Sequence, residues 1–184
     1  MKTIPVKEIM VPLSEYATVP EDATLFEAVI ALGEARVKHA KSLYSHKTVL
    51  VFNSENRIVG KIGQVDILRA LEPKYMKIID SGSLSRFGYT TQFLKSLVDQ
   101  YQLWDKPLND ICQKAVKLKV NTFMVTPADG EYISENSSLD EAIHMLVMGN
   151  HQSLFVKKEN EITGILRLTD LFDKVSESIK LCGL

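Results

Sequence analysis

Cysteine, long hydrophobic runs and net charge are all scarce in this chain. Cys112 and Cys182 are the only cysteines, so the sequence holds neither a disulfide framework nor a paired Cys-x-x-Cys metal or redox motif. This usage is typical of a reducing compartment, and we expect the protein to be cytoplasmic. The longest unbroken apolar run, residues 28–32, is five residues long, against the roughly 20 that a membrane helix needs. Residues 1–8 lack the apolar core of a secretory signal, so we expect neither export nor membrane insertion.

The near-zero charge and the missing motifs argue against two further classes of protein. With 22 basic and 23 acidic residues, the formal net charge is −1. This argues against nucleic acid as a partner, because duplex binding draws most of its affinity from phosphate neutralisation by Lys and Arg. The sequence has no Gly-x-Ser-x-Gly elbow, no P-loop, no Gly-x-Gly-x-x-Gly turn and no metal-ligand spacing. We therefore predict that the protein is not an enzyme and requires no cofactor or metal.

What the sequence does contain is an internal repeat. A shift of 114 positions aligns residues 10–32 with residues 124–146, and a shift of 105 aligns residues 46–51 with residues 151–156. The first copy therefore holds nine extra residues after Leu32. A chain of 184 residues with 45% hydrophobic composition is large enough to bury a core, and we treat the two copies as one domain that shares it.

Each copy begins with the signature of a helix. Thr24-x-x-Glu27 and Ser138-x-x-Glu141 have the spacing of a capping box, in which the hydroxyl accepts from a first-turn N–H and the glutamate accepts from the N–H of the cap residue. Apolar residues then recur at i, i+3, i+4 and i+7, which predicts one buried stripe on an amphipathic helix. These residues are Leu25, Ala28, Val29 and Leu32 in the first copy and Leu139, Ala142, Ile143 and Leu146 in the second.

Strands and a second helix complete each copy. Two short apolar runs flank a polar turn at residues 53–57 and again at residues 158–161, which predicts a hairpin. An acidic residue then opens a second amphipathic stretch, at residues 66–71 and at residues 170–175. The predicted unit is β-α-β-β-α, and the predicted fold class is mixed α/β (α+β). Because a unit of about 60 residues is at the edge of what folds alone, we expect the two copies to pack sheet to sheet with an approximate internal two-fold.

The segment between the copies departs from the repeat and is predicted to be a helical insert. Residues 80–88 have the composition of a loop. A stripe of apolar residues at helical spacing follows at residues 93–101, and a further helix is predicted to start at Pro107 with Asp105 as its cap. The aromatic residues Phe93, Tyr101 and Trp104 of this insert are more typical of a core or dimer stripe than of a surface for another protein.

The order of these motifs, found twice, resembles the CBS (cystathionine beta-synthase) domain. The first copy has Val-Lys-Glu-Ile-Met-Val-Pro at residues 6–12 and Thr-Val-Pro-Glu-Asp-Ala-Thr-Leu-Phe-Glu-Ala at residues 18–28. A stretch similar to the family's Gly-apolar-apolar-x-x-x-Asp motif follows at residues 60–66. The second copy, from Met124 through Asp170, resembles another such domain.

The resemblance implies a tandem CBS pair, or Bateman module, that takes up residues 1–184 as one unit. This unit divides into repeat 1 at residues 4–73, a helical insert or linker at residues 74–105 and repeat 2 at residues 106–178. Members of the family commonly dimerise and bind adenosine-containing ligands in clefts between the two copies. The resemblance therefore implies regulation rather than catalysis.

In the family, the Asp of a Gly-apolar-apolar-Thr/Ser-x-x-Asp motif accepts hydrogen bonds from ribose hydroxyls, and its Thr or Ser meets a phosphate. The resemblance carries the Asp role to Asp66 and Asp170, and the hydroxyl position to Gly63 and Arg167. Neither copy keeps the hydroxyl, but Gly63 leaves only backbone N–H groups, whereas Arg167 offers a bidentate fork suited to phosphate or carboxylate. We therefore predict two non-equivalent sites. A phosphorylated nucleotide is expected at Asp170 and Arg167, and a weaker, empty or uncharged-adenosyl site at Asp66. The alternatives are that each Asp favours a helix N-terminus and that Arg167 forms a surface salt bridge.

Two further segments line the cleft in the family. The residues whose backbone reads the adenine edge correspond to Thr18, Val19, Tyr132 and Ile133. The strand after the first helix brings His46, Thr48, His151 and Ser153. A histidine at a cleft mouth can stack on a base, contact phosphate or act as a pH switch, but a solvent-exposed or dimer-facing histidine is an equally good interpretation. Met10 and Met124 are expected near the adenine segment, with core filling as the more common role.

The leading hypothesis from the sequence is a stand-alone regulatory module. It would sense an adenosine-containing ligand, AMP, ADP, ATP or S-adenosylmethionine, and signal to a regulated partner protein. We expect a homodimer. The alternative is a dimerising structural scaffold that has lost nucleotide binding, because neither Gly63 nor Arg167 supplies the phosphate-binding hydroxyl.

Overall fold

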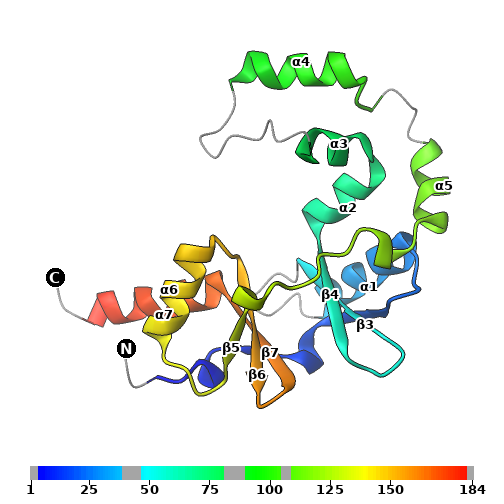
Figure 1. Cartoon of the computed structure of the whole chain (residues 1–184). Helices are drawn as coiled ribbons and strands as arrows, with labels where there is room; N and C mark the ends of the chain where they lie inside the picture. The colour runs from blue at the N-terminus through cyan, green and yellow to red at the C-terminus, as the bar shows by residue number, and fades with distance from the viewer. Residues whose placement is uncertain (1–3, 39–46, 81–89, 105–108, 182–184) are drawn as a thin grey trace. The chain divides into compact units, whose positions relative to one another are not determined.

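The computed structural model of the chain describes residues 4–38, 47–80, 90–104 and 109–181. The chain divides into two compact units, one that combines Met1–Tyr16 with Thr126–Leu184 and one that consists of Ala17–Val125. The chain therefore passes from one unit to the other twice, after Tyr16 and after Val125. Each unit has its own small sheet and its own helices (Figure 1).

The unit Ala17–Val125 is built on a three-stranded sheet of order β2 (Ala17–Pro20), β3 (Thr48–Phe52), β4 (Ile58–Gly63). Strand β2 is parallel to β3, and β4 is antiparallel to it. Helix α1 (Leu25–Lys38) connects the two parallel strands, and α2 (Gln64–Leu71) follows β4. The centre of β3 is buried on both faces, as expected for a continuous apolar run in a central strand. The core of this unit includes Val19, Leu32, Val49, Val51 and Ile62.

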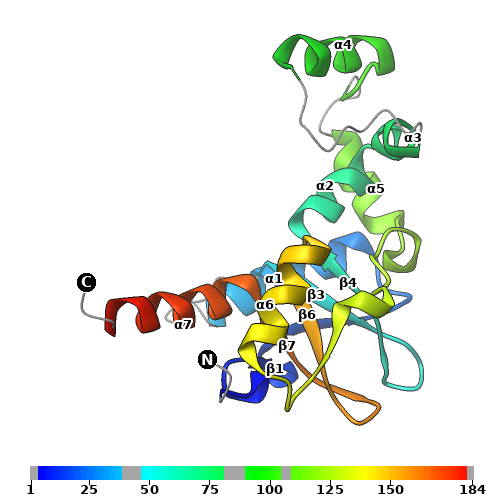
Figure 2. The same ribbon diagram turned by 60° about the vertical axis from the view of Figure 1, so that its left-hand side comes forward.

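The other unit is built on a four-stranded sheet of order β1 (Val11–Pro12), β7 (Glu161–Arg167), β6 (Ser153–Lys158), β5 (Tyr132–Ser134). Helix α6 (Leu139–Gly149) connects β5 with β6, which run parallel, and α7 (Leu168–Leu181) follows β7. Figure 2 shows α6 and α7 with the strands of this unit. The apolar stripe of α6 packs on β6, since Ala142 and Leu146 share one core cluster with Leu154 and Val156.

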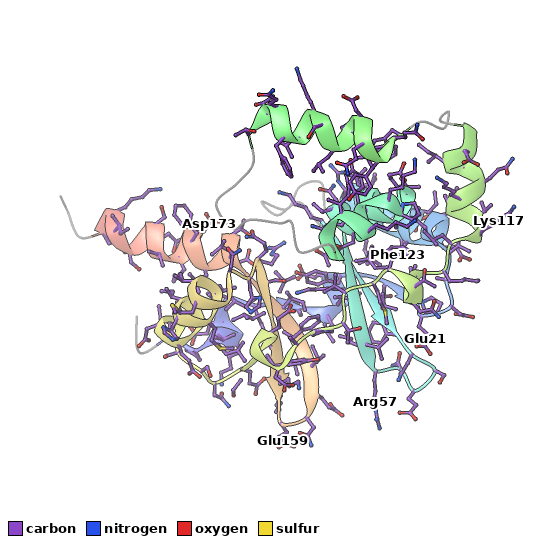
Figure 3. All side chains as sticks on the ribbon, turned by 45° about the horizontal axis from the view of Figure 1, so that its top comes forward. Glu21, Arg57, Lys117, Phe123, Glu159 and Asp173 are labelled. Atoms are coloured by element: carbon purple, nitrogen blue, oxygen red, sulfur yellow. The ribbon has the colours of Figure 1, made fainter. Side chains whose placement is uncertain are left out.

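The two hairpins differ in the length of their turns, which span residues 53–57 in the first and residues 159–160 in the second. Each contains a residue in the left-handed backbone region, Asn56 with φ 59° and Glu159 with φ 54°. In Figure 3, Arg57 and Glu159 mark the tips of these hairpins. The order strand, helix, strand, strand, helix runs as β2-α1-β3-β4-α2 and as β5-α6-β6-β7-α7. This confirms the predicted unit and the mixed α/β class, whereas sheet-to-sheet packing of the two copies stays a prediction.

The opening segment of each copy joins the sheet of the other copy. Val11 of β1 pairs with Ile165 of β7. At the equivalent place, Val125 exchanges two backbone hydrogen bonds with Lys61 of β4, at 2.9 and 3.0 Å. Short 3-10 helices lie in these segments: η1 (Val6–Glu8), η2 (Leu13–Glu15), η3 (Val120–Thr122) and η4 (Asp129–Glu131). The internal repeat therefore includes a reciprocal exchange of opening segments.

Each opening segment also places a methionine over a glycine of the sheet that it joins. A Cβ atom on Gly164 would lie 2.8 Å from Sδ of Met10, and a Cβ atom on Gly60 would lie 2.6 Å from Sδ of Met124. At Gly164 the Cβ atom would also lie 2.7 Å from the backbone oxygen of Val11, so glycine is required there, whereas at Gly60 the side chain of Met124 would have to move. Both methionines pack against the core clusters, in agreement with the core-filling interpretation.

The predicted capping box forms in α1 but not in α6. The backbone N–H of Thr24 donates to Glu27 Oε2 at 2.6 Å, and the N–H of Glu27 donates to Thr24 Oγ1 at 3.2 Å. The N–H of Thr24 and then its hydroxyl lower the pKa of Glu27 below its ordinary value. Ser138 adopts an extended N-cap conformation, but its side chain makes no capping bond, so the second box is wrong. Helix α6 still begins at Leu139, because its buried stripe holds it in place.

The insert contains helices α3 (Lys74–Asp80) and α4 (Thr91–Tyr101), and α5 (Asn109–Lys117) precedes the second copy. Helix α4 confirms the helix predicted from apolar spacing, but none of its side chains is buried. These side chains therefore do not form a core, and a dimer contact stays a prediction. Residues 81–88 of the predicted loop, and the predicted helix start at Asp105 and Pro107, lie outside the described residues.

A buried glutamate fastens the end of the insert. Glu72 accepts from Trp104 N–H at 2.9 Å and from Lys74 N–H at 3.3 Å. Indole Nε1 of Trp104 donates to the Tyr75 hydroxyl at 3.0 Å. Lys74 Nζ donates to the carbonyl of Gln102 at 2.5 Å. The residues that follow α4 are therefore held against the junction of α2 and α3.

Candidate ligand-binding positions

The two predicted carboxylates occupy equivalent positions. Asp66 is the third residue of α2, directly after β4, and Asp170 is the third residue of α7, directly after β7. Side chains at this point of a helix face back toward the free N–H groups of the first turn. The residues three positions earlier, Gly63 and Arg167, end the preceding strands. The repeat thus builds the same strand–helix corner once in each unit.

Asp66 caps its own helix. Its Oδ2 accepts from the backbone N–H of Gly63 at 2.8 Å, which is the carboxylate half of a capping box. Its Oδ1 lies 3.6 Å from Nη1 of Arg69 one turn later, and the Arg69 side chain is half exposed. These contacts of Asp66 agree with the helix-favouring interpretation.

Asp170 is bound by the arginine of its own motif. Nε of Arg167 donates to Oδ2 at 2.7 Å and Nη2 donates to Oδ1 at 2.6 Å. The fork geometry of a guanidinium matches a carboxylate in this way. The side chain of Asp170 is buried and that of Arg167 is largely so. Arg167 therefore forms a salt bridge, as one interpretation expected, but a buried one instead of a surface one.

Tyr16 belongs to the same polar cluster, which sequence reasoning missed. Burial raises the pKa of the Tyr16 hydroxyl well above its ordinary value. The positive charge of Arg167 acts in the opposite direction, and the negative charges of Asp170 and Glu15 add to the increase. In the 114-position register Tyr16 corresponds to Gly130, so no repeated signal marks it.

The strands beside these corners carry the other predicted residues. Thr48 lies opposite Gly63 in the β3–β4 ladder, and Ser153 lies opposite Arg167 in the β6–β7 ladder. Both hydroxyl-bearing residues are half-buried. The structure thus brings Thr48 next to the Asp66 corner and Ser153 next to the Asp170 corner. His46 lies outside the described residues.

The predicted adenine segments are edge strands. In the described sheets, β2 pairs only with β3, and β5 pairs only with β6. Thr18 is exposed, whereas Val19 and Ile133 point into the cores. Tyr132 is half-buried, and Nζ of Lys157 lies 3.5 Å from the centre of its ring.

The ring of Tyr132 is enclosed by its neighbours. It packs at 5.7 Å from the ring of Phe155, and desolvation, followed by the charges of Glu131 and Asp129, raises the pKa of its hydroxyl. Lys157 was not found from the sequence, because the aligned residue in the first copy is Phe52. A cation over an aromatic ring stabilises it electrostatically, so a base could stack on that face of Tyr132 only after Lys157 moves.

His151 packs against glycine. A Cβ atom on Gly149 would lie 2.2 Å from Cδ2 and Nε2 of the His151 ring. The backbone N–H of His151 donates to the carbonyl of Leu146 at 3.0 Å, and Asn150 between them is left-handed with φ 52°. This is the hydrogen bond of a Schellman helix end. His151 is half-buried, so it takes part in ending α6.

Metal clusters and membrane-spanning helices are both absent from the described part of the chain. In the described part of the chain, no cluster of three or more His, Cys, Asp and Glu side chains could hold a metal ion. Among the described helices, none has the length and apolar character needed to cross a membrane.

Solved structures share this fold. A CBS domain-containing protein of unknown function from Bacillus anthracis str. Ames Ancestor is similar with a TM-score of 0.59 and 16% identity, over 96% of this chain and 95% of that one. The CBS domain of the bacterial CNNM/CorC family Mg2+ transporter, in complex with ATP, has a TM-score of 0.59 and 16% identity, over 95% of this chain and 89% of that one. CBSX2 in complex with AMP has a TM-score of 0.58 and 16% identity, over 94% of this chain and 97% of that one. At these identities the likeness shows the fold.

Comparison with curated proteins also gives a relative. The DNA replication and repair protein RecF of Agathobacter rectalis is 22% identical over 165 residues. These residues are 83% of this chain but 43% of that protein, so the chain spans less than half the length of the curated relative that it matches.

The family comparison covers both copies of the repeat. The CBS domain model matches residues 6–73 and residues 119–177, which together are more than half of the 184 residues. The first match includes the complete unit β2-α1-β3-β4-α2, and the second runs from β5 into α7, so that each includes its strand–helix corner. The chain therefore belongs to the CBS domain family, as a tandem CBS pair.

Proposed function

We propose that the chain is a non-catalytic regulatory module that binds an adenosine-containing ligand, AMP, ADP, ATP or S-adenosylmethionine, and signals to a partner protein. The observation that carries the proposal is the match of both copies to the CBS domain, a family whose solved members include structures in complex with ATP and with AMP. Regulation of the partner would require two states of the module with different ligand affinity.

The strand–helix corners support this proposal chemically. Asp66 and Asp170 each place a carboxylate at the start of a helix, and the carboxylate of Asp66 is the more exposed of the two. Two vicinal ribose hydroxyls can donate to one carboxylate, and hydrogen bonds to an ionised acceptor are stronger than neutral ones. Beside each corner, Thr48 or Ser153 supplies a hydroxyl from the neighbouring strand, which partly compensates for the missing hydroxyl at Gly63 and Arg167.

The edge strands support recognition of a base. In the described sheets, β2 and β5 each pair on one side only, so one edge of each strand faces away from its ladder. Unpaired N–H and C=O groups of an edge strand bind extended or planar hydrogen-bonding partners. The backbone of these strands is therefore suited to the edge of an adenine ring.

The proposal is tested by isothermal titration of the purified chain with AMP, ADP, ATP and S-adenosylmethionine, with GMP as a matched control for the base. We expect saturable binding of at least one adenosine compound and weaker binding of GMP. The adenosine-sensor proposal would be rejected if none of the four adenosine compounds released heat on titration into the folded protein and none raised its unfolding temperature.

A dimerising scaffold without nucleotide affinity is the second candidate. It is favoured by one observation, the bidentate bond between Arg167 and Asp170, which occupies the groups expected to bind a nucleotide. Under this alternative the dimer forms normally but none of the four ligands binds.

A homodimer is part of both candidates, and the exposed face of α1 supports it. Phe26 is 49% exposed and Val37 is 79% exposed, although both are large apolar side chains on one helix. A groove on this helix is lined by Val29, Ile30, Gly33, Glu34, Val37 and Lys38. A Cβ atom at Gly33 would meet nothing within 4 Å, so a second helix can approach closely at this point. The occupant that we propose for this face is α1 of a second copy.

A further inference from the structure

The two equivalent corners differ in how far their carboxylates are already engaged. Both oxygens of Asp170 accept from one guanidinium, that of Arg167, at 2.7 and 2.6 Å. In Asp66, one oxygen accepts a hydrogen bond from the backbone N–H of Gly63 at 2.8 Å, and the other oxygen lies 3.6 Å from Nη1 of Arg69. The residue three positions before the Asp, glycine in the first copy and arginine in the second, accounts for this difference.

The two corners also differ in how deeply their ion pairs are buried, which makes the Asp170 pair harder to separate than the Asp66 pair. The side chains of Asp170 and Arg167 are 5% and 14% exposed, against 16% and 48% for Asp66 and Arg69. An exposed ion pair is worth little, so Arg69 can turn away at small cost. Separating a buried pair leaves an uncompensated charge out of water, which is strongly unfavourable. A ribose diol can therefore reach Asp66 after a movement of Arg69, but it reaches Asp170 only by displacing Arg167.

A neutral diol is a poor competitor for Arg167. Its two hydroxyls donate hydrogen bonds to the carboxylate but bring no positive charge, whereas the guanidinium brings both charge and a matching fork. The charges of this ion pair also act on the buried hydroxyl of Tyr16, so the pair is part of a larger polar cluster in its unit.

We infer that Arg167 is the resident partner of Asp170, that it keeps the second corner closed to a ribose diol, and that adenosine binding falls to Asp66. The statement about Arg167 stands on geometry alone, while the assignment to Asp66 rests on the proposed function. The inference reverses the preference drawn from the sequence, in which Arg167 and Asp170 together take a phosphorylated nucleotide.

The ion pair is tested without ligand, by hydrogen exchange at the arginine side chains of the wild-type protein followed by 1H–15N NMR. Arg167→Lys identifies the Nε–H signal of Arg167, and Arg69→Lys identifies that of Arg69, the matched control. We expect the Arg167 Nε–H to exchange at least roughly tenfold more slowly, because it is buried and hydrogen-bonded. Equal exchange rates would overturn the inference.

Titration with AMP then assigns the binding carboxylate. Asp66→Asn and Asp170→Asn make the same change in the two corners, and circular dichroism verifies their fold. We expect Asp66→Asn to weaken AMP binding roughly 10- to 150-fold, the range for losing charged hydrogen bonds. Asp170→Asn should change the affinity by less than about threefold. The reverse pattern would overturn the inference.

Two outcomes need their own readout. If Asp170→Asn does not fold, Arg167→Lys replaces it, because lysine keeps the charge but loses the fork. AMP affinity within about threefold of the wild type then supports the inference, and a larger loss overturns it.

If the wild-type protein binds none of the four adenosine compounds, the proposed function fails and the assignment to Asp66 fails with it. The exchange rate of the Arg167 Nε–H still decides whether Arg167 holds Asp170.

Discussion

At the scale of single residues, two glycines are explained by the methionines above them. Gly60 and Gly164 lie where Met124 and Met10 approach the sheets, so that any Cβ atom would meet sulfur at 2.6 or 2.8 Å. In the second copy the glycine of the family motif is therefore a packing requirement, because a Cβ atom on Gly164 would also meet the backbone oxygen of Val11.

Replacing Gly164 with alanine should destabilise the fold. The added methyl group has to push Met10 or the backbone of Val11, which lies 2.7 Å from the Cβ position, and overpacking of this kind costs about 1–3 kcal/mol. The free energy of unfolding in urea measures the effect. Gly33→Ala is the matched control, because a Cβ at Gly33 meets nothing and alanine favours a helix by about 1 kcal/mol over glycine. Equal stabilities of the two variants would contradict the packing argument.

Tyr16 should make the protein sensitive to alkaline pH. Burial raises its pKa in the folded state, while an unfolded chain loses the proton near pH 10. The folded state thus keeps a proton that the unfolded state releases, so the stability is complete below about pH 10 and falls as the pH rises further. Tyr16→Phe should reduce this decline, by up to roughly 1.4 kcal/mol for each pH unit.

The measurement for Tyr16 is urea unfolding of wild type and variant at about pH 8 and about pH 10.5. Tyr101→Phe, on the exposed helix α4, is the control. A wild-type protein and a Tyr16→Phe variant that lose the same stability between the two pH values would show that Tyr16 is not the group responsible.

At the scale of elements, the insert is attached at its end by Glu72. The carboxylate accepts from the backbone of Trp104 and of Lys74, and Trp104 is the only tryptophan of the chain. Its fluorescence therefore reports this attachment directly.

Glu72→Ala should release Trp104. Two N–H groups lose their acceptor, at a cost of about 1–3 kcal/mol each when they stay buried. We expect the emission of Trp104 to shift to longer wavelength and its quenching by acrylamide to increase. Glu55→Ala, which removes an exposed ion pair with Arg57 on a hairpin, should change neither. Unchanged emission in Glu72→Ala would mean that the bond to Glu72 does not hold Trp104.

The sequence predicts these elements well where their signals are local. The repeat, the capping box at Thr24 and the alternation around the hairpins depend on residues a few positions apart, and both β-α-β-β-α units confirm them. Ser138 has the same local signal but makes no capping bond. The capping-box spacing therefore identifies residues that can form the capping hydrogen bond, but it does not show that they form it.

The site is less predictable because it depends on contacts between distant residues, or on which of several possible partners a side chain binds. Asp170 and Arg167 were both recognised, but the sequence could not decide whether the arginine would bind a ligand or the neighbouring carboxylate. The contact of Lys157 with Tyr132 comes from different strands, and the bond of Trp104 to Glu72 joins residues 32 positions apart. No periodic pattern marks such pairs.

At the scale of the whole molecule, neither sheet is complete without a segment from the other copy. Strand β1 completes the sheet of β5, β6 and β7, and Val125 pairs with β4. This exchange explains how copies of about 60 residues, at the lower limit for independent folding, become stable together. The compact units of the chain therefore do not coincide with the copies in the sequence.

Assembly should depend on the exposed face of α1. Ile30→Glu places a charge in the apolar groove of this helix, and a buried unpaired charge is strongly unfavourable at an interface. We expect the dimer dissociation constant to rise at least roughly tenfold, measured by sedimentation velocity. Val116→Glu on α5 changes an exposed apolar residue and should leave the dimer intact. A fully dimeric Ile30→Glu variant would show that α1 is not the interface.

Isothermal titration of AMP into the wild-type protein and into Asp66→Asn, side by side, tests the central claim most directly. The account predicts saturable binding to the wild type and an affinity lowered roughly 10- to 150-fold in the variant, because charged hydrogen bonds to the ribose are lost. Equal affinity in the two proteins, or no binding of any adenosine compound to a folded wild-type chain, would contradict it.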